Sequence, residues 1–323
     1  MTQKAPGKSH RKGITLIELA NLFPSEDSAR KWYARLNTLA RHRALPLCNS
    51  ENTHECSHVK MPYRCRKCRK YFSVKTGTVM AGSPLPLLKW VYAIYLDLTS
   101  LKGVSSMKLH RDLGITQKTA WHMQQRIREA FASEGSNVMF NGPAEADETY
   151  VGGRESNKHE GKKLRAGRGT VGKTAVAGIK DRESNQIRAK VVARTDAETL
   201  QGFVVKSVSQ DAQIYTDEAT AYQGLPFPHK TVKHSVGEFV DGMAHTNGIE
   251  SFWALMKRGY HGTYHKMSPK HLNRYVAEFS GRHNLRDLDT ISQMEIVASG
   301  LTGKSLSYED LIADNGFDSG ART

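Results

Sequence analysis

The stretch 247–257, N-G-I-E-S-F-W-A-L-M-K, combines residue types that suit metal-assisted phosphate chemistry. Read as a helix, it places Glu250 and Lys257 on one face, two turns apart. Ala254 lies between them, and its small side chain leaves room on that face for a bulky phosphodiester. A carboxylate, a small residue and a cation in this order suit a metal ion and a phosphate together. We therefore expect this stretch to complete an active site.

Two acidic residues upstream are candidate partners for Glu250, namely Asp147 in A-E-A-D-E-T-Y-V-G-G and Asp217 in Q-I-Y-T-D-E-A. Phosphodiester cleavage needs an oxygen nucleophile, in-line geometry and a place for charge on the leaving oxygen. Two hard cations roughly 3.5–4 Å apart supply all three, and Mg²⁺ (or Mn²⁺) prefers carboxylate oxygen as its ligand. Asp147 falls within a predicted strand among small and apolar residues, where an unpaired carboxylate would be costly.

Alternating strand and helix patterns begin after residues 141–143 and must position these acids. A basic, Gly-rich, mobile loop is expected at 152–172, and one helix carries an apolar stripe of Ile249, Phe252, Trp253, Met256 and Tyr260. The predicted strands are 144–151, 174–180, 186–193 and 213–216, with an extended stretch at 229–240, and the predicted helices are 197–208, 247–257 and 270–279. This order predicts an α/β fold of the ribonuclease-H-like kind, a mixed sheet flanked by helices. In it, two strands bring Asp147 and Asp217 together, and a helix brings Glu250.

The segment before the sheet is predicted to be helical, with short helices within 14–40 and a buried helix over 85–98. Residues 103–128 have the pattern of a helix-turn-helix, in which Gly114 turns the chain and Thr116 caps the second helix. The expected inner face is formed by Ala120, Met123 and Ile127. The expected outer face offers hydrogen-bond donors to phosphates or base edges: Gln117, Lys118, His122, Gln125 and Arg128. An ordinary helical hairpin is the alternative, and the basic context favours DNA binding.

Four cysteines lie close together in the sequence: Cys48, Cys56, Cys65 and Cys68. In a chain without an export signal, this clustering favours a metal site over disulfides. The C-R-K-C motif at 65–68 is typical of the second knuckle of a zinc ribbon. The first knuckle has Leu45 where a thiol is expected, so a fourth Zn²⁺ ligand is predicted to be Cys56, or else His54 or His58. The alternative is a ribbon that has lost its metal and persists on hydrophobic contacts.

Composition limits the class of partner. The chain has 323 residues and carries 47 Lys and Arg against 32 Asp and Glu, a formal net charge of +15, which favours polyanions. The sequence contains no apolar run of about 18 residues that would span a membrane. Its amino terminus has no apolar signal core and is predicted to be a basic arm. We therefore expect a cytoplasmic, nucleoid-associated protein that contacts nucleic acid.

Several of these blocks resemble the DDE transposases of insertion sequences that have an ISXO-like catalytic domain and a zinc ribbon. The matching blocks are D-E-T-Y-V-G-G at 147–153, Y-T-D-E at 215–218, H-T-N-G-I-E-S-F-W-A-L-M-K-R-G-Y-H-G-T-Y-H at 245–265, R-K-C-R-K-Y-F-S-V-K-T-G-T at 66–78 and G-I-T-Q-K-T-A-W-H-M at 114–123. The resemblance covers residues 22–284. It implies that Asp147, Asp217 and Glu250 are the metal ligands and that Lys257 and Arg258 contact DNA. The first cysteine knuckle departs from the family pattern.

The resemblance also implies an activity and a domain organisation. The expected enzyme binds the terminal inverted repeats of its element, cleaves at the ends and joins 3′ hydroxyls to target DNA, as a homo-oligomer on paired ends. Two alternatives stay open: a domesticated, catalytically silent DNA-binding regulator, and a hydrolytic nuclease of the same fold. The predicted parts are an arm with helices (1–44), a zinc-ribbon-like domain (45–80), a helix-turn-helix domain (81–138), a catalytic domain (140–300) and a polar tail (301–323).

Overall fold

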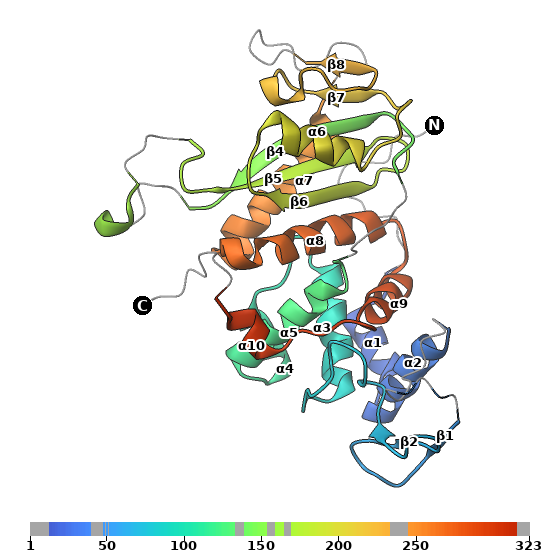
Figure 1. Cartoon of the computed structure of the whole chain (residues 1–323). Coiled ribbons are helices and arrows are strands. Elements are labelled where there is room, and N and C mark those ends of the chain that lie inside the picture. Colours follow the sequence, from blue (N-terminus) through green and yellow to red (C-terminus); the bar gives the residue numbers. More distant parts are fainter. Residues whose placement is uncertain are drawn as a thin grey trace. The chain divides into compact units, whose positions relative to one another are not determined.

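The computed structural model describes residues 13–39, 48, 50, 52–132, 139–153, 159–164, 169–232 and 245–314. The chain divides into two compact units, Met1–Phe131 with Leu285–Ala313 and Ala132–Asn284 with Asp314–Thr323 (Figure 1). The predicted basic arm and Leu45 lie outside the described residues, as do parts of the segments 152–172 and 229–240. None of the helices in the described ranges is long and apolar enough to cross a membrane.

The second unit is built on a five-stranded sheet with the order β6-β5-β4-β7-β8. Its strands are β4 (Ala144–Val151), β5 (Thr174–Asp181), β6 (Ile187–Val192), β7 (Ile214–Thr216) and β8 (His229–Thr231). Neighbours β4, β5 and β6 pair antiparallel, whereas β7 pairs parallel with both β4 and β8. The predicted strands are confirmed, and the mixed sheet has the ribonuclease-H-like arrangement expected from the sequence.

Helices cover both faces of this sheet, as the predicted fold requires (Figure 1). They are α6 (Ala197–Val205), α7 (Asn247–Gly259), which continues as a π-helix over Tyr260–Tyr264, and α8 (Pro269–Leu285). Short 3₁₀ helices occur at Glu160–Lys162 (η2) and Thr220–Tyr222 (η3). The apolar side chains of α6 pack with Ala144 and Ala146 of β4, while those of α7 and α8 pack with Val151 and Val176. Since side chains alternate along a strand, β4 presents its even-numbered residues to α6 and its odd-numbered residues to α7.

The first unit is mainly helical and includes a small antiparallel sheet. Its strands are β1 (Thr53–Glu55), β2 (Tyr63–Cys65) and β3 (Tyr71–Phe72), and its helices are α1 (Leu16–Leu22), α2 (Glu26–Leu39), α3 (Leu87–Thr99), α4 (Ser106–Leu113), α5 (Gln117–Glu129), α9 (Thr290–Gly300) and α10 (Tyr308–Ile312). The predicted buried helix corresponds to α3, in which Trp90, Val91 and Ile94 are fully buried. Apolar burial of this kind is the main source of the unit's stability.

The helix-turn-helix geometry follows the capping residues read from the sequence. Gly114 ends α4 in the left-handed conformation, and the Thr116 side chain accepts a hydrogen bond from the Thr119 amide at the start of α5. The predicted inner face of α5 is confirmed, since Ala120, Met123 and Ile127 are buried. The prediction that Gln125 and Arg128 point outward is wrong, because both are buried in the first unit.

The carboxyl-terminal residues differ from the predicted polar tail. Leu285–Ala313 is part of the first unit, and α10 lies within the segment expected to be a tail. A capping box of Ser307 and Asp310 starts α10, and Leu311 is fully buried. The short, mostly polar segment gives little periodic signal, although Leu311 is buried and Tyr308 contacts α5. The prediction that each of the other domains has its own function stays a prediction.

Candidate active site

Strand β4 carries three acids that face opposite sides of the sheet. Glu145 and Asp147 are odd-numbered residues on the α7 side, while Glu148 points back toward η3 and accepts a hydrogen bond from the Tyr222 hydroxyl at 3.0 Å. Burial and the charge of Asp217 raise the pKa of Glu148, and the Tyr222 hydrogen bond opposes that shift. Asp147 and Glu148 are adjacent in β4, but their carboxyl groups therefore lie on opposite faces of the sheet and contact different residues.

Asp147 is mostly buried and accepts a hydrogen bond from helix α7. The indole Nε1 of Trp253, on α7, donates a hydrogen bond to Asp147 Oδ2 at 3.0 Å. Burial, together with the charges of Asp217 and Glu148, raises the pKa of Asp147 to about 7. A carboxyl group in such surroundings gains most from a nearby cation, because the cation compensates the desolvated negative charge.

Asp217 directly follows β7, beside β4. The parallel pairing sets Ala144 opposite Ile214 and Glu145 opposite Tyr215, and continuing it brings Asp147 opposite Asp217. Asp217 Oδ1 accepts the Ala219 amide at 3.1 Å, which holds the turn after the strand. The pKa of Asp147 responds to Asp217, in agreement with this proximity. The middle of β4 and the residue that follows β7 thus bring the two acids beside each other.

Glu250 lies on the exposed face of α7, one turn before Trp253, and accepts the Thr246 hydroxyl at 2.7 Å. The predicted apolar stripe of the same helix is confirmed as its buried face. Within the described part of the chain, the three acids do not form a group whose ligand oxygens all lie within 4.8 Å of one another. The structure therefore brings Asp147 beside Asp217 and connects Asp147 to α7 through Trp253. Joint metal binding with Glu250 stays a prediction.

The start of α7 is held by Glu145, which the sequence analysis did not single out. Its fully buried carboxylate accepts the Arg182 Nε at 2.8 Å and the Ile249 amide at 2.8 Å, and His245 Nδ1 lies 3.4 Å away. A Cβ atom on Gly248 would lie 2.7 Å from Glu145 Oε2, so a larger residue there would have to displace the Glu145 carboxylate. Glu145 could have been found from its position two residues before Asp147, because period-2 alternation puts both on one face.

The family model of the ISXO2-like transposase domain matches residues 139–284, which carry Asp147, Asp217 and Glu250. Residues 139–284 are an ISXO2-like transposase domain. An uncharacterized protein in transposable element ISH50 of Halobacterium salinarum is 28% identical over 256 residues, covering 74% of this chain and 85% of the relative. The chain therefore contains a transposase-type domain and is similar to a protein in a transposable element.

One comparison with solved structures gives a much weaker likeness. A chain in the cryoEM structure of the simian T-cell lymphotropic virus intasome in complex with PP2A regulatory subunit B56 gamma is 16% identical, with a TM-score of 0.27. The alignment covers 59% of this chain and 65% of that chain, slightly less than two thirds of its length. At this TM-score the likeness carries no argument, and the fold of the transposase domain rests on its own sheet order.

Lys257 and Arg258 lie in the last turn of α7 in the transposase domain, and both are exposed. Ala254 is exposed as well, so Glu250, Ala254 and Lys257 follow one another along the accessible face of the helix. Neither cation makes a hydrogen bond or ion pair to another described residue. Their contact with DNA stays a prediction that this accessible position favours.

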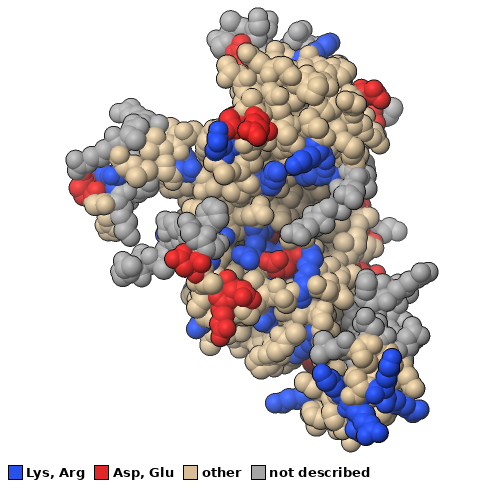
Figure 2. All heavy atoms as spheres, viewed as in Figure 1, with Lys and Arg blue, Asp and Glu red and all other residues tan. Residues whose placement is uncertain are grey.

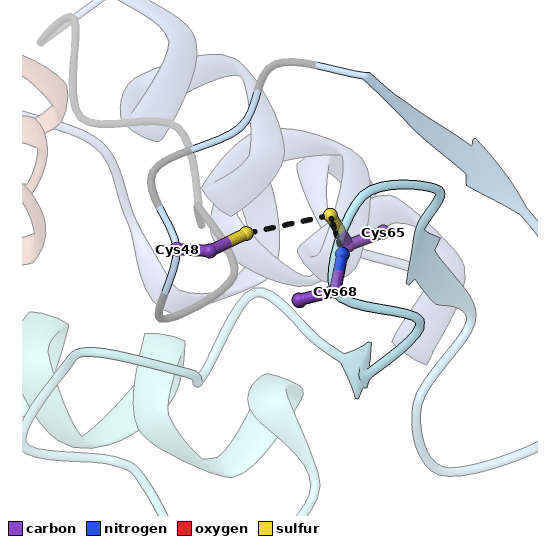
Figure 3. A group of neighbouring side chains, drawn as sticks. All are labelled: Cys48, Cys65 and Cys68. Carbon is purple, nitrogen blue, oxygen red and sulfur yellow. Dashed lines mark hydrogen bonds between the residues drawn. The ribbon is translucent and has the colours of Figure 1, made fainter.

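Outside the transposase domain, three cysteines of the first unit form a compact group (Figure 3). The sulfur atoms of Cys48, Cys65 and Cys68 lie within 4.8 Å of one another, with Cys48 Sγ and Cys65 Sγ 3.6 Å apart. Burial raises the pKa of Cys65, but hydrogen bonds from the Cys68 amide and the Cys48 thiol outweigh it and lower the pKa to about 7. Three converging thiols with one acidic member fit the donor set of a zinc knuckle.

The fourth zinc ligand stays a prediction. The Cys56 thiol donates to the Met61 carbonyl oxygen at 3.5 Å and is not part of the three-cysteine group. His58 Nδ1 accepts the Met61 amide at 3.1 Å. The buried Nδ1 of His54 has no hydrogen-bond partner among the described residues. Cys56 or His54 would have to move to complete the site.

The predicted DNA-contacting residues of α5 have a neighbour that the sequence analysis did not foresee. Gln117 and Lys118 are exposed, and Lys118 Nζ lies 4.4 Å from the ring centroid of Tyr308 in α10. His122 is half-buried against the same ring, with the centroids 5.5 Å apart. Burial and the charge of Arg126 lower the pKa of His122, so it is neutral at pH 7. Of the three residues, only Gln117 and Lys118 offer exposed donors.

Proposed function

We propose that the protein is a DDE transposase that binds the terminal inverted repeats of its insertion sequence, cleaves at the ends and joins the 3′ hydroxyls to target DNA. The observation that carries the proposal is the parallel register of β4 and β7, which brings Asp147 beside Asp217 within the ISXO2-like domain. Helix α7, which carries Glu250, is attached to Asp147 by the Trp253 hydrogen bond. Three acids from two strands and a helix supply hard oxygen ligands of the kind that Mg²⁺ or Mn²⁺ prefers.

The carboxylates are proposed to hold two divalent cations. When bound, the cations activate the attacking oxygen and stabilise charge on the leaving oxygen. Asp147 has to release its proton to act as a ligand, because its pKa of about 7 leaves it partly protonated at neutral pH. Asp217 would hold the opposite side of the site, and Glu250 would close it from the helix. Lys257 and Arg258, further along the accessible face of α7, would bind the phosphate backbone.

DNA ends would be recognised by the first unit. Figure 2 shows Lys and Arg side chains gathered over the ribbon around β1 and β2. Exposed cations of this ribbon are Arg66, Lys67, Arg69 and Lys70, and Arg64 stacks on Tyr71 at 5.1 Å. Clustered cations beside an aromatic ring suit phosphate binding with a stacking contact. Because an element has two ends, we propose that at least two copies assemble on the paired ends.

The proposal is tested with duplex DNA carrying an element end, supercoiled target DNA and Mg²⁺. A transposase yields covalently joined end–target product, detected on a denaturing gel. Cleaved ends without joined product would identify a hydrolytic nuclease. Specific end binding without any cleavage would identify a catalytically silent regulator. Either of these two outcomes would refute the proposed reaction.

A further inference from the structure

Trp253 makes a polar contact as well as filling the core of the transposase domain. It is 3% exposed, and its indole N–H is directed at Oδ2 of Asp147 across 3.0 Å. On α7, Trp253 lies one helical turn after Glu250. The same helix therefore carries one predicted metal ligand and the hydrogen-bond donor that contacts another.

The strand next to Asp147 is shaped to receive this indole. Gly178 of β5 is the direct register partner of Asp147. A Cβ atom at Gly178 would lie 2.5 Å from Cζ2 and 2.6 Å from Cη2 of Trp253, far inside contact distance. The six-membered ring of Trp253 thus lies directly over the Gly178 backbone, which brings Nε1 to the neighbouring strand. Any larger residue at position 178 would push the indole away from Asp147.

A hydrogen bond to one carboxylate oxygen restricts rotation of the whole group. With Oδ2 held by Trp253, the second oxygen of Asp147 is left to face a cation. In metal sites, partners that bond to the far side of a ligand fix its orientation, and losing one typically costs roughly 10–100-fold in metal affinity or activity. Asp147 depends on this restraint because its neighbour Asp217 is also an acid and repels it.

We propose that Trp253, seated on Gly178, is a positioning residue that orients Asp147 for divalent-metal binding. The inference rests on the proposed function, in which Asp147 is a ligand. Trp253 itself touches neither metal nor DNA in this scheme. Gly178 is part of the same arrangement, because a larger residue there would leave no space for the indole to reach Asp147.

The first test is Trp253→Phe, which keeps an aromatic ring in the core and removes the donor. Mn²⁺ affinity is measured without DNA by electron paramagnetic resonance, and cleavage is measured against Mg²⁺ concentration. We expect Mn²⁺ affinity to fall roughly 10–100-fold and the Mg²⁺ half-saturation to rise to a similar extent, with much of the rate recovered at saturating Mg²⁺. The matched control is Trp90→Phe, because Trp90 is buried and its indole N–H has no partner among the described residues. That control should leave metal dependence unchanged.

The second test separates the hydrogen bond from packing. Gly178→Ala alone should weaken Mn²⁺ binding, because the new methyl group displaces the indole. Phenylalanine lacks the two ring atoms that this methyl group would meet, so the double variant Gly178→Ala, Trp253→Phe should regain thermal stability without regaining Mn²⁺ affinity. Recovery of Mn²⁺ affinity in the double variant would show that packing alone matters and would overturn the inference.

Failure of the inference can be told apart from failure of the proposed function. Unchanged Mn²⁺ affinity in Trp253→Phe, with Asp147→Asn inactive, would overturn the positioning role alone. Cleavage by Asp147→Asn would instead overturn the assignment of Asp147 as a ligand. Reduced Mn²⁺ affinity in Trp253→Phe, in a folded protein with Trp90→Phe unaffected, supports the inference.

Discussion

The cysteine group of the ribbon and the acid group of the sheet are both candidate metal sites, and they differ in how far the protein alone assembles them. Three sulfur atoms already lie within 4.8 Å of one another, whereas the three predicted carboxylates do not form such a group. Cys65 and Cys68 come from one tight turn. The acids come from two strands and a helix that are distant in sequence.

Charge explains much of this difference. The sulfur atoms can approach one another because Cys65, whose pKa is lowered to about 7, accepts hydrogen bonds from the Cys48 thiol and the Cys68 amide. Two carboxylates about 4 Å apart repel by about 4 kcal/mol at an effective dielectric constant of 20. A catalytic carboxylate site therefore stays open until cations arrive, while a structural thiol site can be preorganised.

The largest effect is expected for Asp147→Asn. Removing one ligand charge should lower cleavage and joining by roughly a thousandfold or more, because metal ions contribute several kcal/mol to such reactions. Binding to end DNA, measured by gel shift, should stay nearly intact, since the proposed DNA-recognition surface lies in the first unit. Asp217→Asn and Glu250→Gln should behave alike. Full strand transfer in any of the three variants would remove that residue from the site.

The ribbon should respond to metal loss through folding rather than chemistry. We expect about one zinc per purified chain, measured by atomic emission, and loss of zinc in Cys65→Ser with a fall in stability of several kcal/mol. Zinc lost in Cys56→Ser but kept in His54→Ala would identify Cys56 as the fourth ligand. A folded, zinc-free protein that still binds DNA would show that the ribbon persists without metal.

The metal-free acid site should destabilise the fold in a pH-dependent way. The pKa of Asp147 is raised from 3.8 to about 7, so below pH 4 its carboxyl is protonated in both folded and unfolded states. Between these values only the unfolded chain ionises, and stability falls as pH rises until the loss is complete above pH 7. Asp147→Asn should therefore stabilise the EDTA-treated protein at pH 8 by on the order of 2–4 kcal/mol, and little at pH 4. Equal denaturant midpoints at pH 8 would contradict the buried-carboxylate account.

The smallest effects concern single phosphate contacts in the two regions. Lys257→Ala should lower the salt slope of strand transfer by about one unit, and Arg66→Ala should do the same for end binding. Each variant serves as the control for the other, because one residue lies on α7 and the other on the ribbon. An unchanged slope in Lys257→Ala would mark it as an ordinary solvated lysine.

Much of the transposase domain could be predicted because its signals are local. The apolar stripe of α7 and the strand around Asp147 were read from short windows, as was the Thr116 cap in the first unit, and all three agree with the structure. Period and capping depend on neighbouring residues, so a single sequence is enough to place such elements. The helix α10 was missed for the same reason, since its few residues carry almost no periodic signal.

The element order, the three candidate acids and the cysteine knuckle could be read from the amino-acid sequence, because each of these depends on residue type and short spacing. The burial of Gln125 and Arg128 became visible only in the folded chain. The same is true of the Glu145 contact at the start of α7 and of Trp253, which lies over Gly178 and donates its N–H to Asp147. These contacts join residues far apart in the chain. Their partners are selected by strand register and helix packing, and neither is encoded in any one local window.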